Sequence, residues 1–381
     1  MRSNGRRKIL FISHESSLTG APVLLINLLR LLKKRNAFEF EILLARGGPL
    51  EADFKLLAKT DVLKSKTYSA EKRFLYRVKN YVLYLWKLKK WRSYTKNFDI
   101  IFSNTITNGG LLDKINVHHL PVIVYVHELE SIIRTYESDA QLSLSCADKI
   151  AVPSGAVSEN LVQNHSVTKE KIFRLNYFFP FRAVQQTKEA VRLEMMKRFS
   201  IEGKFLVASM GTATHRKGFD LFMEVCNLLK HDPEIFFIWL GDFVDHEMKN
   251  KFEEYVERNG LSKKIMVTGF LPYSFSALLP FDLFLLTSRE DPYPLVVLEA
   301  AFNKLPSISF ESGGITEFIS VDAGWIVPDF SVSQMAEKIL ELRKNPSRVA
   351  EVGNTAFEKA KRLHANEETI ILQLSTLINE V

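Results

Sequence analysis

The chain has few cysteines and no long apolar run, and both absences exclude protein classes. It holds two cysteines in 381 residues, Cys146 and Cys226, which stand far apart and in no metal-ligand spacing. Two lone thiols argue against a disulfide framework and favour reduced core residues in a cytosolic protein. No run approaches the roughly eighteen apolar residues that a membrane-spanning helix requires. The apolar run after the basic start, residues 9–12, is too short for a signal peptide, so we expect a cytoplasmic protein.

Several signatures of ligand binding are also missing. The chain has no Gly-x-Gly-x-x-Gly fingerprint, and the order Lys217-Gly218 lacks the Gly-Lys-Ser/Thr ending of a Walker A loop. The run His127-Glu128-Leu129-Glu130 is not His-Glu-x-x-His, so it predicts no zinc site. The net charge of +7 comes without a recognisable nucleic-acid-binding motif, and we expect no nucleic-acid partner.

What the chain does contain is a regular alternation of short apolar runs and helical patterns. The runs are rich in Ile, Val and Phe and nearly continuous, which is typical of strands buried on both faces. Alternation with short links predicts parallel, doubly wound sheets. The predicted strands are Lys8–Ser13, Phe38–Ala45, Asp99–Ser103, Pro121–Val126, Lys149–Pro153, Phe205–Met210, Ile235–Leu240, Ile265–Thr268, Asp282–Thr287 and Pro306–Phe310.

The alternation is interrupted at residues 178–203, where a polar helical segment replaces the strands. A chain of this length also exceeds one ordinary core. We therefore expect an α/β protein with two Rossmann-like doubly wound domains that face each other across a cleft. The expected ranges are 1–185 for the first domain, 186–365 for the second, and 366–381 for a C-terminal helix that packs back on the first domain.

Two acids stand where a ligand is expected. Asp291 follows the end of a predicted strand, and Glu299 lies eight positions later on the first turns of the next helix. Open α/β sheets bind their ligands at such strand ends. A carboxylate there can accept both hydroxyls of a ribose, and a second one can hold a sugar hydroxyl. This pair indicates an enzyme that handles a nucleotide-sugar.

A second stretch, residues 210–220, follows a strand and opens a helix. Backbone N–H groups at the helix start favour an anion, and Arg216 and Lys217 add two full charges. A leaving nucleoside diphosphate needs this neutralisation because charge grows on its oxygen. Taken alone, the stretch fits a capped surface helix with two solvated cations equally well. The acid pair at the same sheet edge favours the diphosphate site.

Two features of the first half point to the same edge of its sheet. His127 follows the run Val122–Val126 at the carboxyl end of a predicted strand. The alternative is a polar residue that merely closes the strand. Gly20, with Ala21 and Pro22 after it, lies between the first strand and the first helix, where small residues let the backbone approach a ligand. The alternative here is a plain tight turn.

Taken together, these motifs resemble the family-4 glycosyltransferases of GT-B fold. The resemblance covers nearly the whole chain and rests on the order of its motifs, which are 13–22, 126–128, 211–218, 239–241, 288–299 and 313–317. It implies a retaining transfer without a bound metal, and the chain contains no Asp-x-Asp triplet. It also implies no cofactor beyond the nucleoside-diphosphate-sugar substrate. The acceptor is then expected on the first domain and the donor on the second.

The resemblance assigns roles to individual residues. Glu299 holds the donor ribose, Asp291 holds a hydroxyl of the transferred sugar, and Arg216 and Lys217 hold the diphosphate. Backbone N–H groups come from the start of a helix, and His127 lies near the donor sugar across the cleft. The catalytic candidates are His127, Asp291, Arg216 and Lys217, and the donor-binding candidates are Gly20, Thr212, Arg216, Lys217, Glu290, Asp291, Gly314, Ile315 and Glu299.

The chain departs from the family pattern at two of these positions. The family usually has two glutamates eight apart, whereas this chain has Asp291 at the first position with Glu290 beside it. Either carboxylate can contact the sugar. The family often has an arginine directly after the glycine of the strand end, and here that residue is Thr212. The cationic role then falls on Arg216 and Lys217.

Residues 71–97 have a helical pattern with a separate meaning. Apolar residues recur at helical spacing on one face, lysines fall on the opposite face, and aromatic rings are added at residues 84, 86, 91 and 94. The apolar set is Phe74, Val78, Tyr81, Leu85 and Leu88, and the lysines are Lys72, Lys79, Lys87 and Lys90. Such helices settle on anionic bilayer surfaces, which would place the protein at the inner face of the membrane. A core-packed helix with solvated cations is the equal alternative.

The sequence therefore favours a retaining glycosyltransferase. It is expected to move a sugar from a nucleoside-diphosphate donor to a hydroxyl of a glycan or lipid-linked saccharide in the synthesis of a cell-surface polysaccharide. One alternative is a nucleotide-sugar epimerase of the same fold, which needs no acceptor. Another is a catalytically silent subunit that binds nucleotide-sugar or scaffolds a glycan assembly.

Overall fold

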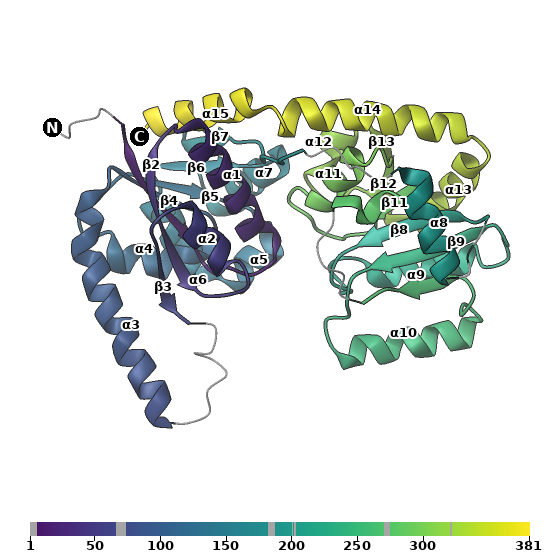
Figure 1. Ribbon diagram of the computed structural model, residues 1–381, viewed down its shortest axis with the longest axis horizontal. Helices are drawn as coiled ribbons and strands as arrows, with labels where there is room; N and C mark the ends of the chain where they lie inside the picture. Colours follow the sequence, from purple (N-terminus) through teal and green to yellow (C-terminus); the bar gives the residue numbers. More distant parts are fainter. Residues whose placement is uncertain are drawn as a thin grey trace. The chain divides into compact units, whose positions relative to one another are not determined.

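The computed structural model describes residues 6–65, 74–181, 187–199, 201, 203–269, 275–320 and 322–381. It divides the chain into two compact units, Met1–Pro180 with His364–Val381, and Phe181–Leu363. We call them the N-terminal and C-terminal units. Each contains a single parallel sheet with helices packed on its faces (Figure 1). Two doubly wound α/β units are the predicted fold class.

The sheet of the N-terminal unit has seven parallel strands in the order β3-β2-β1-β4-β5-β6-β7. The strands are β1 (Lys8–Ser13), β2 (Glu39–Arg46), β3 (Thr60–Lys64), β4 (Ile100–Ser103), β5 (Val122–Tyr125), β6 (Lys149–Val152) and β7 (Ile172–Arg174). The helices are α1 (Gly20–Arg35), α2 (Glu51–Leu57), α3 (Phe74–Tyr94), α4 (Gly109–Ile115), α5 (Glu130–Thr135), α6 (Glu137–Cys146), α7 (Gly155–His165) and α15 (Glu367–Asn379).

The sheet of the C-terminal unit has six parallel strands in the order β10-β9-β8-β11-β12-β13. The strands are β8 (Phe205–Met210), β9 (Ile235–Leu240), β10 (Ile265–Val267), β11 (Leu283–Leu286), β12 (Ser307–Phe310) and β13 (Gly324–Val327). The helices are α8 (Lys188–Phe199), α9 (Phe219–Leu228), α10 (His246–Asn259), α11 (Leu295–Phe302), α12 (Ile315–Ile319), α13 (Val332–Arg343) and α14 (Pro346–His364), whose last residue is counted with the other unit.

The central strands are buried because helices cover both faces of each sheet. Residues 9–12 of β1 and 283–285 of β11 are fully buried, as a continuous apolar run predicts. Large aromatic residues fill the C-terminal core, where the rings of Phe219 and Phe222 pack edge-on against Trp239. Such pairs add to the stability that burial of their apolar area supplies.

The strand order places a switch point in each sheet. In the N-terminal unit the order reverses between β1 and β4, and in the C-terminal unit it reverses between β8 and β11. The loops that follow the two strands diverge there and leave a crevice at their carboxyl ends, where doubly wound proteins bind ligands. The predicted ligand residues of each unit follow strands at or next to this switch point.

The predicted strands are all present, but three further strands were missed. The missed strands β3, β7 and β13 all lie at the edge of a sheet. These strands are short and contain few fully buried apolar side chains, so they lack the continuous apolar run that is typical of a central strand. The helix expected over 131–146 is interrupted at Tyr136, between α5 and α6. Residues 71–73 of the predicted amphipathic segment, with Lys72, lie outside the described residues.

Candidate functional site

The predicted donor residues gather at the carboxyl edge of the C-terminal sheet. Lys217 lies in the loop between β8 and α9, and Asp291 lies between β11 and α11. The Lys217 Nζ contacts Asp291 Oδ2 at 2.5 Å, although the two residues are 74 positions apart. The Asp291 side chain is almost completely buried and that of Lys217 is about one-fifth exposed. A buried carboxylate needs such a partner, so the pair joins the two loops into one site.

Arg216 and Glu290 meet beside this pair. The Arg216 guanidinium donates to the backbone carbonyl of Glu290 at 2.9 Å, and the Arg289 amide donates to the Arg216 carbonyl at 2.9 Å. These bonds hold the cationic loop against the acidic loop. Of the two carboxylates that sequence reasoning left open, Asp291 is the one that contacts Lys217.

Arg289 is a positioning residue that sequence reasoning missed. Its guanidinium binds both carboxylate oxygens of Asp220 at 2.7 and 2.6 Å and also donates to the His215 carbonyl at 2.7 Å. Burial raises the pKa of Asp220, but the hydrogen bonds and charge of Arg289 outweigh it and leave that pKa lowered. The one feature of the sequence that could have indicated Arg289 is its position next to Glu290 and Asp291.

Gly218 allows the loop to pass close to the sheet. Its φ of 66° lies in the left-handed region, and a Cβ at this position would lie 1.7 Å from the carbonyl oxygen of Thr287. Only glycine fits both conditions. The Thr287 hydroxyl in turn donates to the Lys217 carbonyl at 3.2 Å. The position of the two cations therefore depends on this close approach.

The remaining predicted donor residues surround the same edge. Glu299 is half-buried on α11, and Thr212 is exposed just after β8. The Gly314 amide donates to the Asp291 carbonyl at 3.2 Å, which ties the loop after β12 to the acidic loop. Ile315 begins the five-residue helix α12, and its side chain is fully buried. The segments that follow β8, β11 and β12 thus supply the predicted residues of this unit, with Glu299 on the helix after β11.

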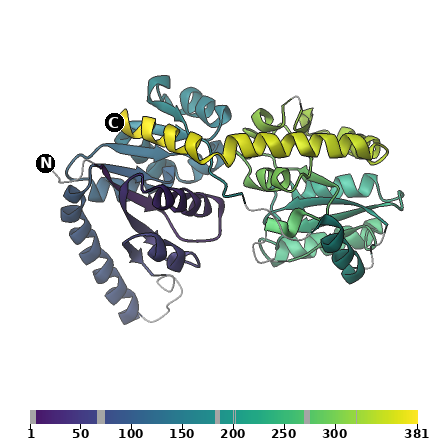
Figure 2. The ribbon, with the colours of Figure 1, turned by 45° about the horizontal axis from the view of Figure 1, so that its top comes forward.

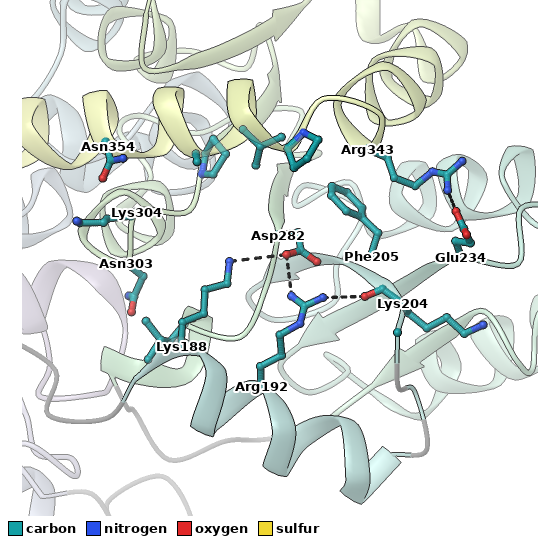
Figure 3. Close-up of a pocket in the computed structure, with 16 residues that line it drawn as sticks. Lys188, Arg192, Lys204, Phe205, Glu234, Asp282, Asn303, Lys304, Arg343 and Asn354 are labelled. Atoms are coloured by element: carbon teal, nitrogen blue, oxygen red, sulfur yellow. Dashed lines mark hydrogen bonds and ion pairs between the residues drawn. The ribbon is translucent and has the colours of Figure 1, made fainter.

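A separate cavity of about 660 Å³ lies at the opposite, amino-terminal edge of this sheet. Figure 3 shows that its charged side chains face one another: Arg192 donates to Asp282 at 2.7 Å, and Lys188 lies 3.7 Å from the same carboxylate. Arg343 pairs with Glu234 nearby. None of the predicted donor residues lines it. Because the ion pairs of Lys188 and Arg192 with Asp282 hold α8 on the sheet, we assign this cavity a structural role.

His127 lies at the carboxyl edge of the N-terminal sheet, directly after β5. Its Nδ1 is 3.1 Å from the Tyr177 hydroxyl and its Nε2 is 3.2 Å from Asn104 Oδ1. Asn104 Nδ2 donates to the Ala21 carbonyl at 2.8 Å, so its oxygen faces the imidazole and sets the Nε2–H tautomer. Burial and the charge of His14 lower the pKa of His127 to about 3. The ring is therefore neutral at physiological pH.

Glu128 and Asn104 are further polar residues at this edge that sequence reasoning did not single out. The backbone amide of His127 donates to Glu128 Oε2 at 2.7 Å, and the Thr105 hydroxyl contacts Oε1. Burial raises the pKa of Glu128 to about 7, which is the range of a general acid or base. Glu128 and Asn104 could have been identified by the feature that identified His127, because each lies just after a buried strand.

Gly20, which was predicted to let the backbone approach a ligand, is more exposed than His127. Gly20 is the first residue of α1 and is exposed, after the β1 end that carries His14 and Glu15. His14 and Glu128 both line a cavity of about 440 Å³, the edge cavity, together with Arg46, Lys64, Lys114 and Asp139. This cavity lies at the carboxyl edge of the sheet, near the switch point between β1 and β4, and neither His127 nor Gly20 is among its lining residues.

Comparison with known proteins gives two family matches. The model described as "Glycosyltransferase Family 4" matches residues 18–175, and the one described as "Glycosyl transferases group 1" matches residues 191–362. The two matches together span most of the chain. Within the described residues, no helix is long and apolar enough to cross a membrane.

Individual relatives are similar at low identity. The alpha-D-kanosaminyltransferase of Streptomyces kanamyceticus is 25% identical over 46% of this chain and 46% of its own length. The poly(ribitol-phosphate) alpha-N-acetylglucosaminyltransferase of Staphylococcus aureus is 25% identical over 48% of this chain and 41% of its own. This chain thus spans less than half the length of either curated relative.

A solved structure matches the whole chain in fold. Anabaena HepE in complex with UDP and glucose superposes with a TM-score of 0.80 at 16% identity, covering 98% of this chain and 100% of HepE. At that identity the likeness establishes the fold, two parallel-sheet α/β domains of GT-B type.

Proposed function

The chain belongs to the family-4 glycosyltransferases of GT-B fold, and from that membership we propose that it transfers a sugar from a nucleoside-diphosphate-sugar to a hydroxyl of a glycan or lipid-linked saccharide. The proposal includes retention of the anomeric configuration, no bound metal and a role in cell-surface polysaccharide synthesis. The observation that carries it is the contact between Lys217 and Asp291 at the switch point of the C-terminal sheet.

In the proposed step the acceptor hydroxyl oxygen forms a bond to the anomeric carbon of the donor. The bond from that carbon to the diphosphate oxygen breaks, and the electron pair leaves with the diphosphate. The hydroxyl proton passes to the departing diphosphate. Arg216 and Lys217 stabilise the charge that grows on the leaving oxygen, which is the largest contribution expected from preorganised cations. Glu299 binds the ribose, and Asp291 binds a hydroxyl of the sugar.

His127 is a neutral ring whose one N–H, on Nε2, is directed at Asn104 Oδ1, while its Nδ1 accepts from the Tyr177 hydroxyl. Its pKa of about 3 excludes an imidazolium at neutral pH. A neutral ring fixed by Tyr177 and Asn104 can orient a polar group without competing with the cations for the diphosphate. We assign it a contact with the donor sugar or the acceptor.

Retention is supported by the names of the two curated relatives, which both specify an alpha linkage. An alpha-linked donor gives an alpha-linked product when the configuration is retained. The anomeric coupling constant of the product, measured by proton NMR immediately after transfer, tests this. A beta-linked product would refute retention and leave transferase activity intact.

The central experiment measures nucleotide binding and turnover. A panel of UDP, GDP, ADP and dTDP is first tested by thermal shift, because a ligand that binds only the folded protein raises Tm by mass action. UDP-glucose and other sugars of the stabilising base are then incubated with and without a saccharide acceptor. We expect acceptor-dependent release of the diphosphate. Conversion of donor alone to another sugar nucleotide would instead indicate an epimerase, and binding without turnover a silent subunit.

The matched variants are Glu299→Ala and Glu299→Gln. Loss of the ribose contact should reduce transfer by orders of magnitude in the first, while circular dichroism and Tm remain those of the wild type. Because Glu299 is only half-buried, we expect the Glu299→Ala protein to fold. Near-normal transfer by Glu299→Ala would contradict the donor assignment.

A membrane contact through α3 is part of the proposal, and exposure favours it over the core-packed alternative. Leu88 and Trp91 pack into the core, whereas Val78, Tyr81, Val82, Leu83, Leu85 and Trp86 are between 44% and 60% exposed. Figures 1 and 2 show α3 extending away from the sheet of its unit. Exposed apolar residues beside lysines fit an anionic bilayer surface.

Liposome flotation tests this contact. Vesicles with phosphatidylglycerol should carry the protein, and neutral phosphatidylcholine vesicles should carry it poorly. Replacing Val82 and Trp86 by Ser should release it from both. Equal flotation of that variant with the wild type would refute a role for α3.

A further inference from the structure

A groove along α3 adjoins the edge cavity and has a different chemistry. It has a volume of about 930 Å³ and is lined by the apolar faces of Tyr81, Tyr84, Leu85, Leu88 and Val117. Five cations also line it, Lys64, Lys89, Arg92, Lys96 and Lys114, and none of the described residues that line it is an Asp or Glu. We call it the α3 groove. The apolar side chains suit a hydrocarbon chain and the cations suit an anionic group, so the α3 groove complements an anionic amphiphile.

Three residues belong to both hollows. Lys64, Tyr84 and Lys114 line the edge cavity as well as the α3 groove, so the two meet at these side chains. Lys64 Nζ lies 4.6 Å from the centre of the Tyr84 ring. Burial, followed by the charges of Arg46 and Lys114, lowers the pKa of Lys64. The three cations are therefore near enough to each other for their charges to interact, and an anion placed among them would be attracted by all three.

The edge cavity beyond this junction is suited to a saccharide. It carries Glu128 and Asp139, together with the side chains of Thr107 and Asn108. Asp139 already accepts a hydrogen bond from the Gly110 amide at 2.7 Å, which fixes its carboxylate in place. Carboxylates, hydroxyls and amides are the groups that bind sugar hydroxyls.

We propose that the acceptor is a lipid-linked saccharide whose phosphate lies between Lys64, Lys114 and Arg46, with its saccharide in the edge cavity and the start of its lipid chain along the α3 groove. This inference rests on the proposed transferase function and selects the phosphate-bearing, lipid-linked member of the acceptor class. It also gives the cations of α3 a specific ligand in addition to a diffuse membrane attraction.

The experiment measures binding of three probes by titration calorimetry, below the micelle concentration. Dodecyl phosphate has the chain and the anion, dodecyl maltoside has the chain and a neutral saccharide, and inorganic phosphate has the anion alone. Since hydrogen bonds to charged groups are worth about 1.5–3 kcal/mol, dodecyl phosphate should bind at least about tenfold more tightly than dodecyl maltoside. Burial of its chain should make it bind at least about tenfold more tightly than inorganic phosphate.

Two variants assign the affinity to residues. Lys64→Gln with Lys114→Gln should weaken dodecyl phosphate binding at least about tenfold. Lys79→Gln with Lys90→Gln also removes two positive charges, but from positions on α3 that line neither hollow, and it should leave dodecyl phosphate binding unchanged. Leu85→Ser, at an exposed position, should weaken dodecyl phosphate but not inorganic phosphate. Circular dichroism confirms that each variant is folded.

Three results would overturn the proposal. The first is equal affinity for dodecyl phosphate and dodecyl maltoside. The second is equal loss in both double-lysine variants, which would mean that α3 attracts any anionic surface. The third is an unchanged affinity in the Lys64 and Lys114 variant. A thermal shift with UDP, GDP, ADP and dTDP on the same wild-type preparation separates the two hypotheses. Binding of a nucleoside diphosphate without dodecyl phosphate binding refutes only the acceptor class, and dodecyl phosphate binding with none of the four nucleotides refutes the transferase.

Discussion

The contact between Lys217 and Asp291 makes the sharpest prediction, because it joins the stability of the fold to the proposed binding of the donor. Replacing Lys217 by Met leaves the carboxylate of Asp291, which is 5% exposed, without its partner at 2.5 Å. Removing one partner of a fully buried ion pair costs about 3–5 kcal/mol. Because the Lys217 side chain is about one-fifth exposed, water screens part of this, and we expect a loss of about 2–3 kcal/mol.

The same substitution removes a cation from the proposed diphosphate site. For a unit of this size, a loss of about 2–3 kcal/mol corresponds to a fall in Tm of about 5–10 °C. Loss of a charge-assisted contact to a phosphate should weaken UDP, or whichever diphosphate the screen identifies, by about 10- to 100-fold. Tm is measured by calorimetry and affinity by titration of the diphosphate.

A double variant separates the two roles. Lys217→Met combined with Asp291→Asn removes the unpaired buried charge, so most of the stability should return while the diphosphate still binds weakly. Lys251 is the matched control, because it forms an exposed ion pair with Glu247 on α10 and its replacement by Met should leave Tm and affinity unchanged. Recovery of diphosphate affinity in the double variant would show that Lys217 serves only as a counter-ion, and an unchanged Tm in Lys217→Met would refute the stability argument.

Three further outcomes are expected. Gly218→Ala should unfold the loop or cost more than about 2 kcal/mol, because its Cβ would lie 1.7 Å from the Thr287 carbonyl; a wild-type Tm would contradict this. The pKa of Glu128 is raised to about 7, so the folded state binds the extra proton between its usual pKa and 7, and stability falls as pH rises through that window. Glu128→Gln should remove that fall, seen as a flatter profile of urea midpoint against pH. Burial lowers the pKa of His364 to about 4, so stability should fall as pH drops from about 6.5 toward 4, and His364→Asn, which does not titrate, should lessen that loss; an unchanged acid profile would contradict this.

Much of the fold followed from local patterns. The central strands were predicted because a strand covered on both faces must be apolar along its whole length, and β1 and β11 have that composition. The edge strands β3 and β7 were missed because one side of each lacks a neighbour, which removes the need for continuous apolar residues. The break at Tyr136 between α5 and α6 also had no proline or glycine to announce it.

The residues of the proposed donor site were selected by type and position, but their contacts were not predicted. Asp291 and Lys217 were identified because each follows a strand, and their pairing depends on β8 and β11 being neighbours in the sheet. The role of Arg289 in holding Asp220 and His215 depends on the same adjacency. No local pattern states which strands are neighbours.

The amino-acid sequence by itself determined the class of the fold, the loops that carry charge and the kind of ligand they suit, because hydrophobic periodicity and residue chemistry act over a few positions. The tertiary structure decided which charges are paired, which face of α3 is exposed, and that Lys64 and Lys114 connect two hollows. These features arise from contacts between segments far apart in the chain. Their energies depend on burial and distance, which exist only after the sheets have formed.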